Sequence, residues 1–509
     1  MKTLHCKLAL WLFLLLLLTG CFSPLDYKGS GDTTLRVSLP GGTAGARTAV
    51  TPEDLRYELH FSGPGGRTVT ATAVYGETVT VNVVPGTWTV SVWAYDSVGI
   101  PKAVGEAYNI DVKAGKENNV PMKMAVYTEV STWADLATAI TTGTYDEFIV
   151  LKGDITGFTG STITISNKKI TLAATVDATI TPASFTGSFF DITNNGSLVM
   201  GFASPEYKNN QLTFNGNSVA TSFVTVTSGS FTMNSGTIKQ FVIVVVVTNM
   251  GRFLLNGGLI TNNNSGVDNQ GFFTMTGGAI FDNFDGAANL TSGVYNRYQA
   301  TFIMSGGTIS NNVEPWGITG GVRNWGNFTM SGTALITRNT ADQCGGVFNQ
   351  GTFTMNGGTI SENEGYQGGG ILNGESGLGT FIMNGGIISG NEATISGGGV
   401  YNSQTFIMNG GTIKSNTAPN GSGISSTAFS MSGNALVDPD NDVYFSTPGF
   451  LTINGRLTRY SAGTFTRITL NSYTTPRQVL DGLTSEFGKF RMSDDANYGI
   501  DANGYLYAK

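Results

Sequence analysis

Residues 397–416, GGGVYNSQTFIMNGGTIKSN, decide the fold. The stretch contains three apolar clusters, VY, FIM and TI, and Gly, Asn or Ser ends each of them within a few residues. No cluster is long enough for a helix, and none pairs with its neighbour as an obvious hairpin. Because similar stretches recur along the chain, we interpret this one as a unit of a repeat architecture.

The middle cluster is the most regular part of the repeat. Its Met, or the apolar residue that replaces it, recurs at intervals of 20 to 29 residues, which is within the usual range for solenoids. A tetrapeptide such as GVYN or GVFN precedes many copies, and one such as ISNN or IKSN follows. The Met or its substitute occupies positions 233, 255, 275, 304, 330, 355, 383, 408, 431 and 453.

Three short strands per repeat suit one coil of a parallel β-helix. In FTM, the two-residue period of a strand points Phe and Met to one face and Thr to the other. Phe and Met should therefore stack inward, while the Ile of GTI and the Val of GVYN supply the other inner walls. Gly and Asn suit the corners, which need left-handed backbone conformations, and stacked Asn side chains can bond between coils. The predicted core ladder comprises Phe231, Met233, Phe273, Met275, Phe302, Met304, Phe353, Met355, Phe381, Met383, Phe406 and Met408.

In the opening stretch, Val400, Phe406, Met408 and Ile413 are expected to point inward. The longer intervals contain extra residues, for example 283–292 and 312–320, which we expect to form loops that leave the coil.

The repeat resembles those of pectate-lyase-like right-handed parallel β-helices, including polymorphic outer-membrane adhesins. The adhesin motif GGAI occurs literally at residues 277–280. The chain departs from the adhesins because their paired F-x-x-N tetrapeptide is not regularly present and no C-terminal domain of alternating membrane strands is visible. The resemblance covers about residues 127–460 and implies a single-stranded right-handed parallel β-helix, that is, a solenoid. It implies a fold more than a function.

The rest of the chain predicts further parts of an all-β protein. Residues 34–125 alternate apolar and polar residues between turns, which predicts an antiparallel β-sandwich. Within them VPGTWTVSVWAYDSVG, residues 84–99, resembles bacterial immunoglobulin-like or prealbumin-like accessory domains. That resemblance implies that Trp88, Trp93 and Tyr95 fill the core between the sheets; a sugar-stacking platform is the alternative.

Residues 126–200 predict a helical cap and the first coils. In STWADLATAI, residues 131–140, Ser131 is the expected N-cap of a helix that covers the end of the coil stack. Residues 201–460 are the β-helix repeats, and residues 461–509 are final coils and a C-terminal cap, with a short helix or turn in TTPRQVLDGL.

The N-terminus predicts the compartment. Residues 1–20 have two lysines, an apolar run and small residues, which is the plan of a signal peptide. The ending LTGC, residues 18–21, resembles the bacterial lipobox, which implies cleavage before Cys21 and a diacylglycerol on its thiol. Residues 21–33 then form a lipidated tether. This predicts a membrane partner through the lipid and a place in the bacterial cell envelope. In the lipoprotein family an Asp after the Cys often retains the protein at the inner membrane, so the resemblance implies that Phe22 favours the outer membrane. Whether the protein faces the cell surface or the periplasm stays open.

Composition excludes several classes of function. Charged residues make up only 12% of the chain, the net charge is −7, and no Lys/Arg cluster occurs, which argues against nucleic acid as a partner. After cleavage His60 is the only histidine. Cleavage also removes Cys6 and leaves Cys344 as the only cysteine besides the acylated Cys21, so we expect no disulfide and a buried, inert thiol. No cofactor and no metal site are expected, because DPDND, residues 438–442, lacks the Gly and the terminal Glu of an EF-hand loop and SDDAN, residues 493–497, is equally well a turn.

Two functions remain open. A polysaccharide lyase needs clustered acids with an Arg or Lys base, and a hydrolase needs paired carboxylates. The repeat zone has only scattered acids, which we interpret as solvated charges. We therefore favour a non-enzymatic surface protein that binds host, matrix or carbohydrate ligands or has a structural role. The alternative is a lyase or hydrolase with a site in the loops at 281–327 or 362–378. The acids in question are Asp282, Asp285, Asp342, Glu362 and Glu364.

Overall fold

The structure is a computed structural model of the 509-residue chain. It describes residues 33–39, 54–143, 146–201, 211–248, 250–284, 291–374, 377–446, 449–461 and 464–509. The predicted signal peptide and Cys21 lie outside these residues, as does Asp285. The chain is all-β, with 57% strand and 5% helix. It divides into two compact units, Met1–Met124 and Ala125–Lys509.

The first unit contains two sheets. One has the order β4-β1-β7, in which β1 runs antiparallel to β4 and parallel to β7. The other is antiparallel, in the order β3-β2-β5-β6. Residues of both sheets, Leu35 and Phe61 among them, share one hydrophobic cluster. The likeness to immunoglobulin or prealbumin domains stays a prediction. The strands are β1 (Thr34–Ser38), β2 (Arg56–Gly63), β3 (Arg67–Ala73), β4 (Thr78–Asn82), β5 (Gly86–Tyr95), β6 (Pro101–Val112) and β7 (Glu117–Pro121), with a 3₁₀ turn η2 (Pro64–Gly66).

The second unit opens with β8 (Met124–Val130) and the helix α2 (Trp133–Thr142). The predicted N-cap Ser131 is wrong by one residue, because the side chain of Thr132 accepts the hydrogen bond from the backbone N–H of Asp135. The helix buries Trp133, Leu136 and Ile140 in the solenoid core. The part of the chain that the structure describes contains no helix with the length and apolarity of a membrane span.

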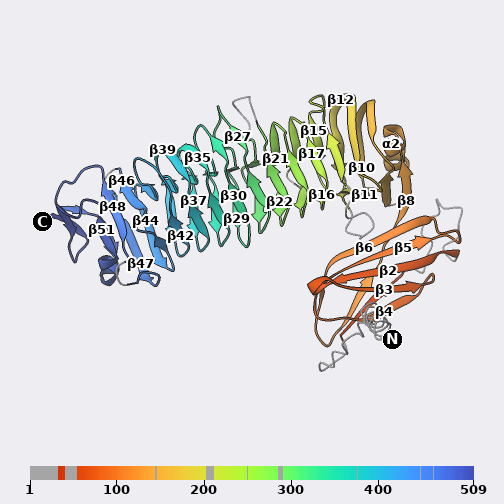
Figure 1. Cartoon of the computed structure of the whole chain (residues 1–509), viewed down its shortest axis with the longest axis horizontal. Coiled ribbons are helices and arrows are strands. Elements are labelled where there is room, and N and C mark those ends of the chain that lie inside the picture. Colours follow the sequence, from red (N-terminus) through yellow and green to blue (C-terminus); the bar gives the residue numbers. More distant parts are fainter. Residues whose placement is uncertain are drawn as a thin grey trace, which may run out of the picture. The chain divides into compact units, whose positions relative to one another are not determined.

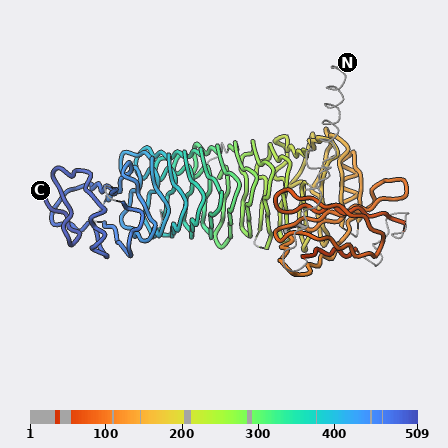
Figure 2. The backbone as a smooth tube through the Cα atoms, turned by 60° about the horizontal axis from the view of Figure 1, so that its bottom comes forward, coloured from red at the N-terminus to blue at the C-terminus, as the bar shows by residue number. Residues whose placement is uncertain are grey.

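Residues from about 126 to 492 form a right-handed parallel β-solenoid of about 14 turns, which confirms the predicted β-helix and its repeats (Figures 1 and 2). Three ladders of parallel strands run along it, and we name each after its inward residues. The Phe–Met wall comprises β9 (Glu147–Leu151), β11 (Lys169–Ala174), β13 (Ser197–Met200), β16 (Ser230–Met233), β19 (Arg252–Leu255), β22 (Phe272–Met275), β25 (Thr301–Met304), β29 (Asn327–Met330), β33 (Thr352–Met355), β37 (Thr380–Met383), β41 (Thr405–Met408), β44 (Phe429–Gly433), β47 (Leu451–Leu457) and β50 (Leu480–Gly482).

The other two walls share long first strands, β10 (Ile155–Ser166) and β12 (Ala178–Thr193), because β12 pairs with both β14 and β15. The Ile wall continues through β14 (Leu212–Asn215), β17 (Thr237–Lys239), β20 (Leu259–Thr261), β23 (Ala279–Phe281), β26 (Thr308–Ser310), β30 (Leu335–Thr337), β34 (Thr359–Ser361), β38 (Ile387–Ser389), β42 (Thr412–Lys414) and β45 (Leu436–Val437). The Val wall continues through β15 (Ser222–Val226), β18 (Ile243–Val247), β21 (Ser265–Asn269), β24 (Val294–Asn296), β28 (Val322–Asn324), β32 (Val347–Asn349), β36 (Ile371–Asn373), β40 (Val400–Asn402), β43 (Ile424–Ser426), β46 (Asp442–Phe445), β48 (Thr466–Leu470) and β51 (Phe490–Met492).

A fourth, short ladder was not expected from the sequence. Its strands lie along the upper edge of the solenoid in Figure 1, between the Ile wall and the Val wall of the same coil. The prediction that residues 312–320 only form a loop is wrong for Val313–Glu314, which pair in parallel with the next coil. The strands are β27 (Val313–Glu314), β31 (Thr340–Ala341), β35 (Glu364–Gln367) and β39 (Glu392–Ser396).

The core is a stack of like residues. The predicted ladder residues are all buried, with no side chain more than 2% exposed. Neighbouring Phe rings from Phe231 to Phe429 lie 4.6–5.3 Å apart and within 14° of parallel, because the spacing between parallel strands fixes the spacing of the rings. Phe253, Phe328 and Phe429, which the predicted list leaves out, complete this stack. In the opening stretch, Val400 and Ile413 are also fully buried.

Two buried columns of Asn tie the coils together. In the first, each Nδ2 donates to the Oδ1 of the next Asn at 2.9–3.0 Å, and each backbone N–H donates to the same oxygen at 3.0–3.2 Å. In the second, along the Val wall, the Nδ2–Oδ1 distance between Asn residues is 2.7 Å. The first column is Asn263, Asn283, Asn312, Asn339, Asn363, Asn391, Asn416 and Asn441, and the second is Asn269, Asn296, Asn324, Asn349, Asn373 and Asn402.

The C-terminal end closes the stack with a small antiparallel sheet in the order β49-β53-β52. Residues of the stretch predicted to contain a short helix or turn form β49 (Arg477–Gln478) and β50, and the helical turn η3 (Thr484–Lys489) follows them. The hairpin strands are β52 (Tyr498–Ile500) and β53 (Tyr505–Ala508).

Candidate binding surface

Those of the candidate acids that the structure describes do not all meet in one cleft. Asp282 and Glu362 occupy the same corner position after the Ile wall, both with a left-handed backbone (φ 52° and 55°). They are three coils apart, or about 14 Å at the usual strand spacing of ~4.8 Å, which is too far for the carboxyl pair of a glycosidase at ~5–9.5 Å. Glu362 forms an exposed ion pair with Arg338 at 2.7 Å, and Asp342 is exposed beside β31.

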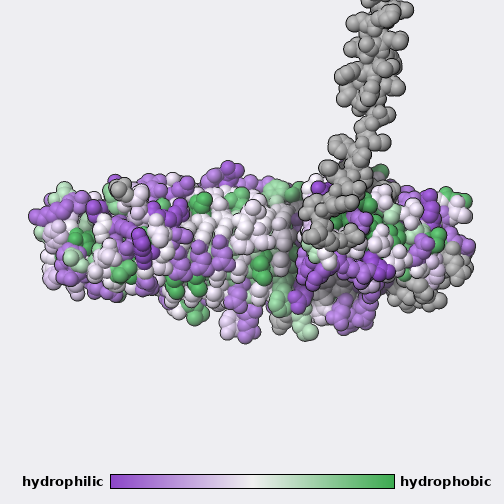
Figure 3. Space-filling model, turned by 90° about the horizontal axis from the view of Figure 1, so that it is seen from below, coloured by the Kyte–Doolittle hydropathy of each residue, from purple (hydrophilic) through white to green (hydrophobic). Residues whose placement is uncertain are grey.

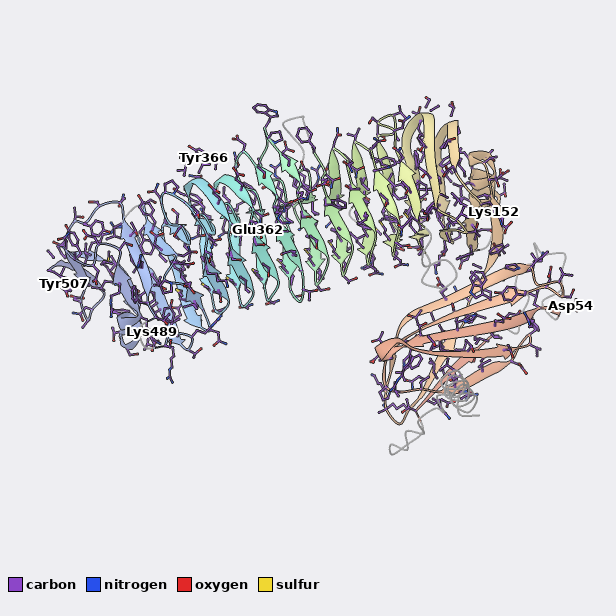
Figure 4. All side chains as sticks on the ribbon, in the orientation of Figure 1. Asp54, Lys152, Glu362, Tyr366, Lys489 and Tyr507 are labelled. Carbon is purple, nitrogen blue, oxygen red and sulfur yellow. The ribbon has the colours of Figure 1, made fainter. Side chains whose placement is uncertain are left out.

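One pair of carboxylates is closer than the sequence suggests. Glu364 on β35 and Glu392 on β39 are in register on adjacent coils, so their backbones are about 4.8 Å apart. Both side chains are exposed, and Tyr366 on the same strand as Glu364 is 52% exposed and projects from the edge of the solenoid (Figure 4). Sequence reasoning missed the pair because it depends on the fourth ladder.

The candidate nucleophile and metal ligands have structural roles. Cys344 is fully buried, its Sγ lies 3.0 Å from the carbonyl oxygen of Gly368, and burial raises its pKa to about 12. His60 belongs to the other unit. Asp440 and Asp442 accept hydrogen bonds from residues of the preceding coil. Within the described ranges, no group of three or more His, Cys, Asp or Glu side chains is placed to hold a metal ion.

The aromatic residues of the first unit are packed. The side chains of Trp88 and Trp93 are only 2% and 1% exposed, and Trp88 lies in the shared core. Trp93 stacks on Tyr95 at 6.3 Å between ring centroids. Trp88 therefore packs in the core between the sheets as predicted, whereas the prediction is wrong for Trp93 and Tyr95, which lie on the opposite face of β5 and outside the shared hydrophobic cluster.

The solenoid has another group of aromatic side chains, at the corner where the Val wall turns into the Phe–Met wall. Three arginines lie over aromatic rings there. The guanidinium carbon of Arg297 is 4.4 Å from the ring centroid of Tyr295, and that of Arg323 is 4.8 Å from the same centroid. On the Phe–Met wall, Arg252 at the start of β19 contacts Phe272 at the start of β22. The guanidinium carbon of Arg252 is 4.6 Å from the ring centroid of Phe272. We call this the arginine–aromatic corner, and its members are Arg252, Asp268, Gln270, Phe272, Tyr295, Arg297, Tyr298, Arg323 and Trp325.

A shallow hollow of about 250 Å³ lies within this corner, and Gln270, Tyr295, Arg297, Tyr298 and Trp325 line it. Tyr298 is 74% exposed, so one aromatic ring is open to solvent.

An ion pair fixes the position of one of the three arginines. Arg297 donates to both carboxylate oxygens of Asp268, Nε to Oδ1 at 2.5 Å and a terminal nitrogen to Oδ2 at 2.9 Å. The Asp268 carboxylate raises the pKa of Arg297. Such a two-point contact holds the guanidinium plane in one orientation.

The sequence contained a signal for this corner that was not used. Asp268, Tyr295 and Arg323 occupy the third position of GVDN, GVYN and GVRN, and that position points outward. Arg297 and Trp325 both follow the last Asn of the motif. Aligning the repeats therefore places these side chains on neighbouring coils.

No family model, no curated protein and no solved structure matches this chain. The resemblances to pectate-lyase-like helices, adhesins and lipoproteins therefore stay predictions.

Proposed function

We propose that this chain is a lipid-anchored protein of the bacterial cell envelope whose β-solenoid binds carbohydrate without cleaving it. The arginine–aromatic corner carries this proposal. It combines rings, guanidinium groups and the amide of Gln270 around one shallow hollow on a rigid wall. Sugars offer an apolar C–H face for rings and hydroxyl groups for polar side chains, so residues of these types suit them.

Among the described residues, the separation of Asp282 from Glu362 and the exposed ion pair of Glu362 with Arg338 favour binding over catalysis at these acids. Much of the middle of the solenoid is pale in Figure 3, as expected for a surface rich in Thr, Ser and Gly. Such a wall suits contacts with a polymer along the coil axis. The lipid on Cys21, implied by the lipobox-like LTGC, is the proposed anchor.

Binding and cleavage are scored separately in the decisive experiment. Full-length protein in detergent is passed over immobilised polysaccharides, and retention and newly formed chain ends are measured. We expect retention without cleavage. Release of new chain ends that Glu364→Gln abolishes would overturn the proposal.

The anchor has its own test. Cys21→Ala is expected to move the protein from the membrane fraction to the soluble fraction of the cell, whereas Cys344→Ala, which alters a buried thiol, should leave it in the membrane fraction. Equal partitioning of the native chain and Cys21→Ala contradicts the lipid anchor.

A hydrolase is the second candidate, and the register of Glu364 with Glu392 favours it. Their strand spacing of about 4.8 Å is close to the ~5–5.5 Å that separates the two carboxyl groups of retaining glycosidases. Tyr366 beside them offers a ring for a sugar. Cleavage that is lost in both Glu364→Gln and Glu392→Gln, and kept in Glu362→Gln, would establish this function.

A further inference from the structure

We infer that the arginine–aromatic corner binds the sulfate groups of a sulfated polysaccharide. The inference rests on the proposed carbohydrate-binding function and names the class of carbohydrate. Its first support is the distribution of charge along the solenoid. Between residues 240 and 413 the sequence has no lysine, four arginines and nine acidic residues. Three of the four arginines, Arg252, Arg297 and Arg323, belong to the corner.

The acids of this segment lie elsewhere. Among those that the structure describes, only Asp268 belongs to the corner, whose formal charge is therefore 3 − 1 = +2 in a chain of net charge −7. The others lie on or beside the Ile wall and the fourth ladder, where the remaining arginine, Arg338, pairs with Glu362. A local positive patch on an acidic protein attracts anionic ligands and disfavours cationic ones.

The geometry of the guanidinium groups is the second support. Arg252, Arg297 and Arg323 each lie over a ring, and Arg323 is also 5.7 Å from the ring centroid of Trp325. A ring under a guanidinium group stabilises its charge and restricts its motion while its N–H groups stay directed along its plane. Planar N–H forks match the oxygens of sulfate, phosphate and carboxylate.

The same contacts disfavour a neutral sugar. Both Arg297 and Arg323 lie over Tyr295, so this ring is used to hold guanidinium groups instead of a sugar. Tyr298, with its exposed ring, remains for the sugar face beside an anionic group.

The shape of the corner favours an extended ligand. Its residues come from four successive coils, β19 to β28, which span about 14 Å at ~4.8 Å per coil. The hollow of about 250 Å³ is smaller than the ~300–1,000 Å³ pockets that enclose small ligands, so a chain lying across it is the better fit. A protein partner would need an apolar anchoring pocket, which this hollow does not provide because two guanidinium groups cover its central ring. A nucleic acid extends beyond the patch and meets the acidic remainder of the chain.

Binding of dextran sulfate tests the inference, with unsulfated dextran of equal length, poly-glutamate and duplex DNA as competitors. Full-length protein in detergent should bind dextran sulfate, lose affinity as salt rises, and ignore the other three. Arg252→Gln should weaken binding several-fold, and Arg252→Gln combined with Arg323→Gln at least tenfold. Arg338→Gln, at the corner that follows the Ile wall, is the matched control and should bind normally. Circular dichroism checks that each variant keeps the β-solenoid.

The outcomes separate this inference from the function on which it rests. Equal binding of dextran and dextran sulfate, lost in the double variant, overturns the sulfate inference and keeps carbohydrate binding. Tighter binding of poly-glutamate or DNA shows that the ligand class is wrong. Unchanged binding by the folded double variant shows that the site is elsewhere. No binding of any polysaccharide overturns both proposals.

Discussion

Replacing Asn339 with Ala tests the buried Asn column, which we expect to be the main source of order between coils besides apolar stacking. Asn339 is fully buried in the middle of the column. Its Oδ1 accepts from the backbone N–H of Asn312 at 3.1 Å and from Nδ2 of Asn312 at 2.9 Å. Its own Nδ2 donates to Oδ1 of Asn363 and to the carbonyl of Ile309, both at 3.0 Å.

Asn339→Ala removes the acceptor for two N–H groups of Asn312 that stay buried. A buried donor without a partner costs about 1–3 kcal/mol, so the two together lower the free energy of unfolding by about 4 kcal/mol. A water molecule that enters the vacated space reduces this loss to roughly 2–3 kcal/mol. Asn384→Ala is the matched control, because Nδ2 of Asn384 makes a similar bond at 2.9 Å to Asn356, but on the exposed corner. There water replaces the lost partner, and we expect a change below about 1 kcal/mol.

Two measurements check this. Urea unfolding followed by circular dichroism should show a midpoint about 1 M lower for Asn339→Ala than for Asn384→Ala. Because solenoids can unfold in parts, hydrogen exchange of the Asn312 amide gives a local readout, and it should accelerate only in Asn339→Ala. Equal midpoints for the two variants, or unchanged exchange at Asn312, would refute the idea that the buried Asn column contributes more to stability than the exposed bond between Asn384 and Asn356.

Three further predictions follow from the core and the C-terminal end. Met355→Ala should lower the free energy of unfolding by about 2–5 kcal/mol through the cavity it leaves, whereas Thr354→Ala, on the outward face of the same strand, should change it by less than about 1 kcal/mol in the same urea titration. Cys344 should resist maleimide labelling at pH 8 in the folded protein and react in urea, because burial raises its pKa to about 12; rapid labelling of the folded chain would contradict this. Burial raises the pKa of Glu486, but hydrogen bonds from Lys489 and from the Leu457 amide outweigh it and lower the pKa overall. Because the pKa of Glu486 is lower in the folded state, its carboxylate stabilises the fold above the unfolded pKa of about 4.3, and this stabilisation is lost as the pH falls through the folded pKa. The C-terminal coils should therefore loosen in acid, and Glu486→Gln should remove this pH dependence of hydrogen exchange.

The inward half of the fold was predictable because inward positions obey simple rules. The period of two in FTM and the spacing of the Met positions fix which side chains stack, and the strands pair in that register from Met233 to Ile453. The Gly at the corner before each Ile-wall strand, such as Gly386 before β38, is predictable for a similar reason, because a larger residue would clash there. A Cβ on Gly386, whose φ is 90°, would lie 2.5 Å from Cε of Met355. Such steric demands repeat in every coil, so they are visible in one sequence.

The parts that were missed lack such a rule. The fourth ladder uses strands of two to five residues with no shared motif, for example Val313–Glu314 and Glu392–Ser396, so no periodicity marks it. The pairing of Glu364 with Glu392 depends on that ladder and was invisible for the same reason. The N-cap was misplaced because Ser131 and Thr132 are adjacent and both residue types suit the position.

The division between predictable and unpredictable positions bears on where function is located. In GVxN the Val and Asn are held by stacking and by the hydrogen bonds of the second Asn column, while the position between them faces outward and is free to vary. A binding surface on a solenoid can therefore be built by changing only that position and the corner after it, without disturbing the stack. Asp268, Tyr295 and Arg323 are three different residues at this one position on successive coils, and they meet in the arginine–aromatic corner. The inward stack holds the backbone rigid, so side chains at these outward positions are about 4.8 Å apart from one coil to the next. The order of the repeats therefore sets the spacing of the charged groups that a ligand contacts.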